Sequence, residues 1–475
     1  MRYIVTPEEM RGVEQAAFAA GVPSLLLMET AARRAIEALA RMVPRGGRAV
    51  FLCGPGNNGG DGLAMARIWH LMGNEAAVVL PQAPKTPDAQ TNLSYVRALG
   101  IPVSETLTGS ADALADALFG TGFHGAVDPE STCGRLIGAA NALGRPILAV
   151  DIPSGMDGQT GAAAGPCIRA AETVTFHAAK RGLIFSPHRE LLGRLTVADI
   201  GLPQGVGLPW ADSLAELLPP RRADAHKGDC GRVVICAGSA GMAGAVTMAA
   251  LACLRAGSGL VTVACPAEIL PILQKTVPNA MCRPIAEAAQ VRCDARLLGC
   301  GLAETEDTWR LLTALHDESV PEVWDAGALN LLARHPMRLG ANAIITPHVG
   351  EAARLLGTPI PQIVADPVAA AQALREKYAC HAVLKSAVSV ICAADGAMAV
   401  NAVDAPALAK GGSGDALAGI LASLLGQGLP FMRAMQAACL WHGLAGRLAG
   451  ERFGVRSALT GEVIDCLGQV QETGM

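Results

Sequence analysis

The stretch AVFLC-GPGNNGGDG-LAMARIWHL, residues 49–71, joins an apolar run to a glycine-rich turn and then to a helical pattern. Residues 49–53 predict a buried strand, and residues 63–71 predict a helix. The glycines of residues 54–62 let the backbone turn tightly and approach a ligand closely. Free backbone N–H groups at a helix start can hold an anion, although a tight turn with a helix cap would use the same residues. The stretch predicts the first strand–turn–helix step of an α/β fold.

Strand and helix patterns alternate outward from this stretch. Thr6 can cap a first helix, in which Pro7 suits the first turn and Glu8 and Glu9 complement the helix dipole. The other elements expected here are a helix at 24–42, strands at 76–80, 113–119 and 146–150, and helices at 89–99 and 135–143. Short strands that alternate with helices predict a parallel sheet wound on both faces.

The second half repeats this alternation after a proline-rich stretch. A chain of 475 residues exceeds the size at which a single hydrophobic core stops growing, so two domains are expected. Residues 201–222 contain four prolines and end in Pro-Pro-Arg-Arg, as a linker would. Beyond it we expect strands at 232–237, 259–265, 296–299, 322–325, 343–346 and 382–385, and a helix at 244–255. The sequence therefore predicts two doubly wound α/β domains, 1–212 and 223–475, with a linker at 213–222.

Composition and charge exclude several function classes. The chain is 51% hydrophobic and 17% charged, which is typical of a compact enzyme and not of a disordered chain. A net charge of −4 without a basic cluster argues against a nucleic-acid partner. The 14 cysteines form no C-x-x-C pair, which disfavours a zinc site and fits a reducing compartment. Acidic residues near the start and short apolar runs predict a soluble, cytoplasmic protein without membrane contact.

Polar side chains gather where three strands of the first half end. Asp116 lies near the end of strand 113–119, and Asp151 and Ser154 follow strand 146–150. The glycine turn adds two amides and a carboxyl group: Asn57, Asn58 and Asp61. Ligands of doubly wound sheets bind at these carboxyl ends, and amide carbonyls suit a hard monovalent cation. The sequence predicts that these groups meet in one cleft, with Asp116 as a purely structural cap as the alternative.

A second glycine-rich turn, KGGSGD at residues 410–415, opens an apolar helix. Gly412, Ser413 and Gly414 can present N–H groups to a transferring phosphoryl group, while Asp415 accepts or delivers a proton. An N-capped helix would explain the glycines but does not require Asp415. Other groups at strand ends could join this site: the loop 238–245, residues 298–302, His348 and Lys385. A structural histidine and a solvated lysine are the alternatives there.

The first half, roughly residues 1–210, resembles the NAD(P)H-hydrate epimerase domain. The resemblance rests on GPGNNGGDG at 54–62, DALFGTG at 116–122 and VDIPSG at 150–155, although the family's Ala-Gly after the second helix start is Ala31-Ala32. It implies a Rossmann-like three-layer domain that holds potassium through Asn58, Asp116 and Ser154. The implied contacts to the hydrated nicotinamide nucleotide are Asn57, Asn58, Gly59, Gly60, Asp61, Gly120, Thr121, Gly122, Phe123, His124, Gly125, Ala126 and Asp151. Inversion at the hydroxyl-bearing carbon needs a positioned acid/base, for which Asp151 is our candidate.

The second half, roughly residues 223–475, resembles the ADP/ATP-dependent NAD(P)H-hydrate dehydratase, a relative of ribokinase-type kinases. The resemblance rests on HKGDCGRVVI at 226–235, on the strand-end segments and on the KGGSGD turn. It implies a ribokinase-like fold that phosphorylates the hydroxyl of the hydrate and then eliminates phosphate. The implied contacts to the hydrate are Ala245, Gly301, His348 and Asp415, of which Asp415 is also catalytic. The implied contacts to the adenine nucleotide are Lys385, Ser386, Ala387, Val388, Ser389 and Gly414.

Three motifs of the second half depart from the family's pattern. The family's K-G-A-x-T is KSAVS at 385–389, its D-A-D-A-L is DAGAL at 325–329, and its N-P-G-M-A is replaced within DAPALA at 404–409. These changes put nucleotide affinity and rate in question more than the function itself, because Asp415 and its glycines are kept. A degenerate, inactive second domain is the alternative.

Together the two resemblances imply a bifunctional metabolite-repair enzyme. It would interconvert the R and S forms of hydrated NADH and NADPH (NADHX and NADPHX) and dehydrate the S form with ADP or ATP and Mg²⁺. ADP is the expected donor, and a homo-oligomer is the expected assembly. A ribokinase-type kinase for a vitamin-precursor alcohol and a non-catalytic nucleotide-binding scaffold are the other classes. The fused first domain argues against the kinase, and the joint presence of Asp116, Asp151 and Ser154 argues against the scaffold.

Overall fold

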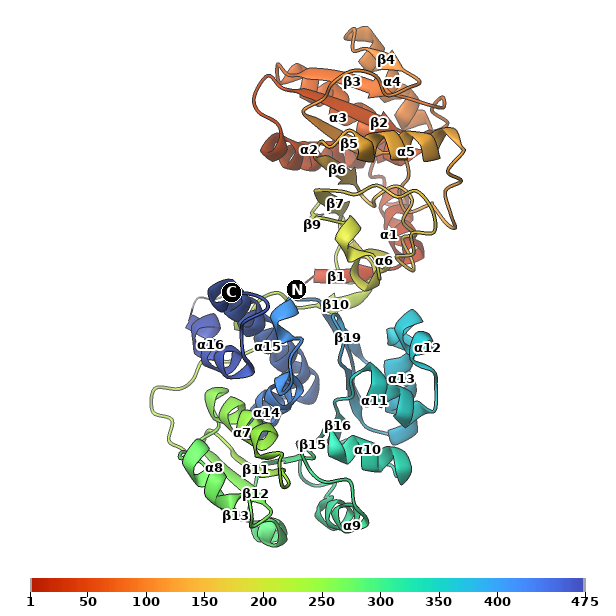
Figure 1. The fold of residues 1–475 in the computed structure, drawn as a ribbon. Helices are drawn as coiled ribbons and strands as arrows, with labels where there is room; N and C mark the ends of the chain where they lie inside the picture. Colours follow the sequence, from red (N-terminus) through yellow and green to blue (C-terminus); the bar gives the residue numbers. More distant parts are fainter. Residues whose placement is uncertain (1, 473–475) are drawn as a thin grey trace. The chain divides into compact units, whose positions relative to one another are not determined.

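The computed structural model describes residues 2–472 of the chain. Met1 and residues 473–475, the outermost ends of the two expected domain ranges, lie outside the described residues. The chain divides into two compact units, Arg2–Leu208 and the part from Pro209 onward (Figure 1). The segment expected as a linker, 213–222, belongs to the second unit, where it contains the short 3-10 helix η2 (Leu214–Glu216).

A seven-stranded parallel sheet forms the centre of the first unit, in the order β4-β3-β2-β5-β6-β7-β9. Its strands are β2 (Arg48–Cys53), β3 (Glu75–Val79), β4 (Val103–Ser104), β5 (Ala113–Ala117), β6 (Ile147–Val150), β7 (Glu172–Phe176) and β9 (Arg194–Ala198). A short parallel pair, β1 (Arg2–Val5) and β8 (Ala179–Lys180), accompanies it. The four strands expected from the sequence in this half are confirmed, whereas β4, β7 and β9 were not expected.

Alternate residues of β2 face two different cores. Phe51 belongs to the core beneath α2 (Ser24–Met42), α3 (Asn57–Leu71) and α4 (Pro87–Ala98), whereas Val50 and Leu52 belong to the core beneath α5 (Thr132–Ala142). Successive side chains of a strand point to opposite faces, so helices cover both faces of this sheet. The predicted three-layer, doubly wound architecture is confirmed for this unit.

The first helix, α1 (Pro7–Ala19), begins as its sequence predicts. Thr6 and Glu9 form a reciprocal capping box, in which the Thr6 hydroxyl accepts from the Glu9 N–H at 3.0 Å. The unit also contains the short helices α6 (Arg181–Phe185) and η1 (Arg189–Leu191). One side of α1 lies beside the loops that follow the central strands.

The first glycine turn is shorter than the sequence suggested, because α3 begins at Asn57 rather than at Leu63. A Cβ atom on Gly59 would lie 1.8 Å from the carbonyl oxygen of Gly54. Only a glycine lets the first turn of the helix approach its own entry loop so closely. The close approach at Gly59 is to protein backbone, which agrees with the tight turn expected from the sequence.

The sheet of the second unit runs in the order β13-β12-β11-β14-β15-β16-β17-β18-β19-β10. Its strands are β10 (Leu208–Trp210, whose first residue closes the first unit), β11 (Arg232–Cys236), β12 (Leu260–Cys265), β13 (Met281–Pro284), β14 (Ala295–Leu298), β15 (Glu322–Trp324), β16 (Ala343–Ile345), β17 (His381–Leu384), β18 (Ser389–Cys392) and β19 (Met398–Asn401). The six strands expected here are confirmed. The sheet is parallel from β13 to β17, but β17, β18 and β19 pair antiparallel, which was not expected. The connection after Leu384 is too short for the crossover that parallel strands need.

Helices cover both faces of this second sheet as well (Figure 1). One face carries α7 (Ala243–Arg255), α14 (Ser413–Gly426), α15 (Phe431–Phe453) and α16 (Thr460–Glu472), and the other carries α10 (Gly327–Arg334), α11 (Val349–Leu356), α12 (Ile360–Ala365) and α13 (Pro367–Tyr378). The remaining helices are α8 (Leu270–Thr276), α9 (Glu306–Leu315), η3 (Ile285–Gln290) and η4 (Pro406–Leu408). None of the helices within residues 2–472 combines the length and the apolar character needed to cross a membrane.

Candidate active sites

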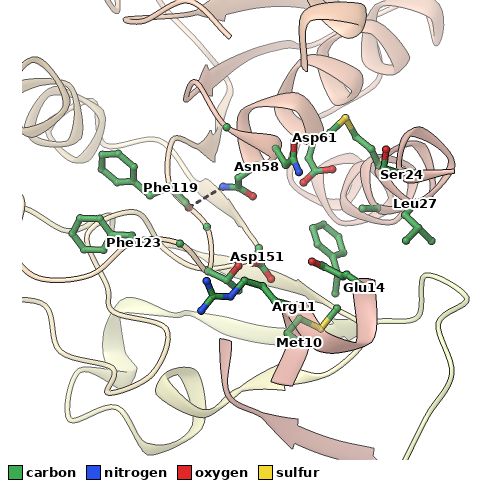
Figure 2. Close-up of a pocket in the computed structure, with 18 of the residues that line it drawn as sticks. Met10, Arg11, Glu14, Ser24, Leu27, Asn58, Asp61, Phe119, Phe123 and Asp151 are labelled. Carbon is green, nitrogen blue, oxygen red and sulfur yellow. Dashed lines mark hydrogen bonds between the residues drawn. The ribbon is translucent and has the colours of Figure 1, made fainter. Parts of the chain in front are cut away.

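A cavity of about 650 Å³ opens where β2, β5 and β6 end in the first unit. The loops after these strands form one wall, and residues of α1 and α2 form another. Figure 2 shows three carboxyl groups around this space, from Glu14, Asp61 and Asp151. All the lining residues belong to Arg2–Leu208, so this is a site of the first unit alone.

Most residues expected to contact the hydrate line this cavity. They are Asn57, Asn58, Asp61, Gly120, Thr121, Gly122, Phe123, His124 and Asp151. Gly59 and Gly60 are buried and do not line it, and Gly125 and Ala126 are exposed outside it. The rings of Phe119 and Phe123 stack with centroids 5.0 Å apart, which gives the lining an apolar, aromatic patch.

Asp151 is held by a buried lysine that the sequence analysis missed. The Nζ atom of Lys180 lies 2.7 Å from Oδ1 of Asp151, and the lysine side chain is only 2% exposed. The Thr175 hydroxyl donates to the same carboxylate oxygen at 3.0 Å and accepts from Lys180 at 3.0 Å. Asp151 itself has a φ of 67°, an unfavourable backbone geometry for a residue with a side chain. Strain and a buried ion pair together fix this carboxylate at the cavity wall.

Asp116 lies beneath the cavity rather than in its lining, and is fully buried. Its carboxylate accepts from the Ser154 hydroxyl at 2.6 Å and from the Ser154 N–H at 2.8 Å. Burial raises the pKa of Asp116 to about 6, although these hydrogen bonds oppose the shift. Asn58 joins the group by donating to the carbonyl oxygen of Phe119 at 2.8 Å, and Phe119 in turn donates to Ser154. The three residues expected around a cation therefore lie in one connected network.

Two further carboxyl groups face Asp151 across the cavity. Burial, followed by the negative charges of Asp151 and Glu14, raises the pKa of Asp61 well above its ordinary value. Burial also raises the pKa of Glu14, which comes from α1 and was not singled out in the sequence. The amphipathic spacing of α1 did not indicate that Glu14 lines a cavity, because Glu14 reaches the cavity only when α1 lies against the loops. The cavity thus offers the salt-bridged carboxylate of Asp151, two carboxyl groups with raised pKa values and a fourth carboxyl group from Asp88.

In the second unit, Lys385 meets Asp325 just beyond the ends of β17 and β15. The Nζ–Oδ1 distance is 2.7 Å, and both side chains are largely buried. Burial by itself lowers the pKa of Lys385, but the carboxylates of Asp325 and Glu351 outweigh it and leave that pKa raised. A Cβ atom on Gly414 would lie 3.1 Å from Nζ of Lys385, so the glycine turn directly borders this ammonium. The sequence marked Asp325 only as part of a departing motif and missed this pairing.

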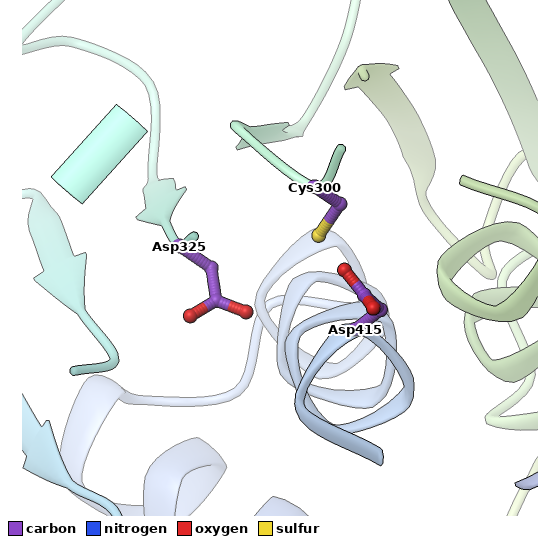
Figure 3. Close-up of side chains that lie close together, drawn as sticks. All are labelled: Cys300, Asp325 and Asp415. Atoms are coloured by element: carbon purple, nitrogen blue, oxygen red, sulfur yellow. The ribbon is translucent and has the colours of Figure 1, made fainter. Parts of the chain in front are cut away.

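Asp415 lies at the same point, in the first turn of α14. Its carboxylate oxygen, a carboxylate oxygen of Asp325 and Sγ of Cys300 all lie within 4.8 Å of one another (Figure 3). Burial and the charge of Asp325 raise the pKa of Asp415, while a hydrogen bond from the Cys300 thiol opposes this. Gly412, the residue before α14, has a φ of 87°, the left-handed region that glycine tolerates. The expected glycine turn and its acid are therefore both present at a helix N-terminus.

The other residues expected in the second site fall into two groups around it. Gly301 lies beside Ala245, since its Cβ atom would be 3.0 Å from that of Ala245. His348 and Lys385 form an isolated parallel β-bridge through their backbones. The Nδ1 atom of His348 accepts a hydrogen bond from the Gly350 N–H at 3.0 Å. The remaining expected residues form the turn that follows Lys385: Ser386 and Ala387 are exposed, Val388 is buried and Ser389 begins β18.

Comparison with known proteins gives two family matches, one in each unit. Residues 24–182 match the YjeF-related protein N-terminus, and residues 233–468 match NAD(P)H-hydrate dehydratase. The bifunctional NAD(P)H-hydrate repair enzyme of Moorella thermoacetica is 38% identical over 98% of this chain and 96% of its own length. That of Escherichia coli is 36% identical over 97% of this chain and 92% of its own. This chain belongs to the family of bifunctional NAD(P)H-hydrate repair enzymes.

A solved structure covers the second unit of this family member. The ADP/ATP-dependent NAD(P)H-hydrate dehydratase of Bacillus subtilis, co-crystallised with ATP and Mg²⁺, is 30% identical, with a TM-score of 0.52 over 55% of this chain and 96% of its own. A ribokinase-like superfamily protein of Enterococcus faecalis has a TM-score of 0.51 at 27% identity, over 56% of this chain and 95% of its own. Both resemblances drawn from the sequence and the ribokinase-like fold of the second half are confirmed. The chain is an enzyme with an epimerase-type and a dehydratase-type half.

Proposed function

We propose that the first unit interconverts the R and S forms of hydrated NADH and NADPH, and that the second unit dehydrates the S form to regenerate the coenzyme. One observation carries this proposal: the match to bifunctional repair enzymes spans nearly the whole chain. The aspartate at each candidate site, Asp151 and Asp415, supports it. A single substrate then accounts for both glycine-rich turns.

In the proposed epimerase, Asp151 acts as the acid/base at the hydroxyl-bearing ring carbon. Departure and return of this hydroxyl as water require a proton donor and acceptor at a fixed position. Lys180 orients the Asp151 carboxylate through an ion pair of 2.7 Å. The amides of Asn57 and Asn58 and the loop 120–126 would contact the nucleotide, with the Phe119–Phe123 patch against a flat ring.

The donor set beneath the first cavity fits a potassium ion. Asn58, Asp116 and Ser154 offer amide, carboxylate and hydroxyl oxygens, the ligand type that hard cations prefer. Among the described residues, the hydrogen bonds of Asp116 come from Ser154 and Leu118, and no lysine or arginine forms an ion pair with it. A bound cation would supply the missing positive charge, hold the loops together and shield the phosphates of the nucleotide.

In the proposed dehydratase, Asp415 takes the proton of the hydroxyl group of the hydrate as that oxygen attacks the terminal phosphoryl group. Lys385 and the N–H groups of residues 412–414 would hold the phosphoryl group during transfer. The transfer releases AMP from ADP, or ADP from ATP. Phosphate is then a better leaving group than hydroxide, so its elimination, together with a proton from the neighbouring ring carbon, restores the dihydronicotinamide ring. The turn from Lys385 to Ser389 and Gly414 would contact the nucleotide, Mg²⁺ would enter with its phosphates, and Ala245, Gly301 and His348 would contact the hydrate. ADP is the proposed donor, with ATP as the alternative.

The recovery of NADH from its hydrate tests the dehydratase directly. The purified full chain is mixed with hydrated NADH and Mg²⁺ plus ADP or ATP, and the absorbance of NADH is followed. Recovery is expected with at least one nucleotide, and Asp415→Asn should abolish it while the exchange between hydrate epimers continues. Recovery with neither nucleotide would refute the dehydratase assignment. Phosphate transfer to vitamin-precursor alcohols instead would favour a kinase.

The exchange between the R and S hydrates tests the epimerase in the same preparation. Chromatography separates the two epimers, and Asp151→Asn should stop their interconversion without changing the rate of NADH recovery from the S form. Undiminished exchange in Asp151→Asn would show that Asp151 is not the acid/base. The same proposal includes a homo-oligomer, by likeness to dehydratase relatives, and a cytoplasmic location. Light scattering on the purified chain measures the assembly.

A further inference from the structure

A thiol, which is a soft metal ligand, and two carboxylates, which are hard ligands, meet in the second unit. Sγ of Cys300, which follows β14, lies within 4.8 Å of carboxylate oxygens of Asp325 and Asp415, and those oxygens lie equally close to one another. Figure 3 shows the three side chains pointing toward a common centre from three separate segments. Cys300 is fully buried and Asp325 is 2% exposed. Within residues 2–472, no second group of three histidine, cysteine or acidic side chains comes together in this way.

The charges at this point favour a cation. Asp325 and Asp415 each bring a carboxylate, and the ammonium of Lys385 contacts that of Asp325. One ammonium against two carboxylates leaves the site net negative, and low solvent exposure strengthens the attraction for a positive ion. The thiol adds a soft ligand that hard cations such as Mg²⁺ and K⁺ do not seek, whereas Zn²⁺ binds thiolate and carboxylate together.

We propose that Cys300, Asp325 and Asp415 form a binding site for a thiophilic divalent cation, with Zn²⁺ as its representative, and that occupation of this site blocks the dehydratase. The second part rests on the function proposed above, because it requires that Asp415 act in the reaction. The first part does not depend on it.

The geometry needs only small side-chain rotations to accept the ion. Tetrahedral Zn²⁺ takes bonds of about 2.3 Å to sulfur and about 2.0–2.2 Å to oxygen, so its ligand atoms lie roughly 3.3–3.8 Å apart. The three ligand atoms are already within 4.8 Å of one another. Binding would replace the thiol proton of Cys300 by the metal and release that proton to solvent. The fourth position would take a water molecule.

The effect on catalysis follows from the position of Asp415. A carboxylate that ligates a divalent cation is a poor proton acceptor, and the ion would also draw Asp325 away from Lys385. Lys385 would then lose its partner at the place where phosphate is to be held. The first unit contains none of these residues, so the exchange between hydrate epimers provides a control within the same molecule.

Metal binding is measured first, without substrate, on the full chain. Co²⁺ serves as a spectroscopic substitute for Zn²⁺, because thiolate coordination gives Co²⁺ an intense near-ultraviolet charge-transfer band. Equilibrium dialysis with Zn²⁺ should give one more tightly bound equivalent for the wild type than for Cys300→Ser, and Cys300→Ser should lose the cobalt band. Asp325→Asn should weaken Zn²⁺ binding by at least about tenfold, since even indirect metal contacts are worth that much. Cys282→Ser, on the separate strand β13, is the matched control and should keep both signals.

The rate measurement then tests the block. Zn²⁺ at saturation should lower the dehydratase rate of the wild type at least about tenfold, a chelator should restore that rate, and epimer exchange should not change. Equal binding of Zn²⁺ and equal cobalt bands in wild type and Cys300→Ser would overturn the site. If the wild type bound Zn²⁺ through Cys300 but kept its dehydratase rate, the proposed block would be overturned. If the metal-free wild type showed no dehydratase activity, the proposed function would fail, while dialysis would still decide the metal site.

Discussion

Lys180 and Asp151 form a buried ion pair, and each charge is tolerated in the folded protein because the other is present. The lysine side chain is 2% exposed, and its ammonium lies against three oxygen acceptors: the Asp151 carboxylate, the Thr175 hydroxyl oxygen and the Phe176 carbonyl. Removing one partner of such a pair leaves an uncompensated buried charge. Asp151 is thus ion-paired, whereas burial raises the pKa values of its neighbours Asp61 and Glu14.

We expect Lys180→Met to destabilise the first unit by about 3 kcal/mol, because Asp151 then lacks its counter-charge. The double variant Asp151→Asn, Lys180→Met removes both charges and should recover part of that loss, since no charge is left buried. Hydrogen exchange of amides in Arg2–Leu208 measures the local free energy of opening in both variants. Equal losses in the single and double variants would mean that packing of the lysine chain, not its charge, matters here.

Glu351 gives the second unit a pH-dependent stability. Burial raises the pKa of its carboxyl group from 4.5 to about 7, with Lys385 opposing the shift. The folded state therefore holds this proton more tightly than the unfolded state does. The stability that it contributes is full below about pH 4.5 and is lost as the pH rises through 7.

We expect Glu351→Gln to flatten that dependence. The difference in unfolding free energy between Glu351→Gln and wild type should shift in favour of the variant by up to about 3 kcal/mol between pH 4.5 and pH 7. Denaturant unfolding at a series of pH values, with the four tryptophans of the second unit dominating the fluorescence, provides the measurement. Parallel pH profiles for the two proteins would contradict the raised pKa.

At the scale of elements, the first turn of α3 lies very close to the loop that leads into it. A Cβ atom on Gly59 would meet the Gly54 carbonyl oxygen at 1.8 Å, whereas one on Gly56 would meet nothing within 4 Å. Gly59→Ala should therefore destabilise the first unit by about 4 kcal/mol or more and distort the cavity loop, while Gly56→Ala should cost no more than about 1 kcal/mol. Hydrogen exchange in peptides from α3 compares the two variants. A mild effect of Gly59→Ala would show that the helix can shift away from its entry loop.

The same helix shows how far the sequence could predict the elements. Apolar runs located the strands that end at the Asn57-Asn58 turn, Asp151 and Lys385, but not β7, whose last residue, Phe176, lines the first cavity together with Lys180. Thr6 and Pro7 located the start of α1. The start of α3 was placed too late because glycines usually indicate a turn, and only the close backbone contact at Gly59 explains why they are helical here. The antiparallel strands β18 and β19 were missed, since their apolar runs also fit parallel strands.

The sites were predictable where a motif carries the chemistry. Asp151, Asp415 and the Asn57-Asn58 turn lie at strand or helix ends that the pattern already indicated. Lys180 was missed because it belongs to no local motif. Cys300 lies within residues 298–302, a segment that the sequence already placed near the second site, but nothing local in that segment marked its thiol as a ligand. Their partners are 29 and 115 positions away in sequence, and tertiary folding alone brings them together.

At the scale of the whole molecule, each unit contains its own candidate site. The cavity of the first unit is lined entirely from Arg2–Leu208, and the cluster around Asp415 and Lys385 lies entirely beyond Pro209. A ligand of one reaction should therefore stabilise only the loops of its own unit.

Hydrogen exchange on the full chain tests this separation. Replacing Na⁺ by K⁺ should slow exchange in residues 54–62, 116–123 and 151–155, whereas ATP with Mg²⁺ should slow it in residues 385–389 and 411–415. A ligand at about 100 times its dissociation constant stabilises the bound state by about 2.7 kcal/mol, which corresponds to roughly 100-fold slower exchange through local opening. Asp116→Asn should remove the K⁺ effect and leave the ATP effect, because only the first involves that carboxylate. Protection by K⁺ in 385–389, or its persistence in Asp116→Asn, would contradict the potassium ligands proposed here, because the protected loops would then not be those that Asp116 and Ser154 connect.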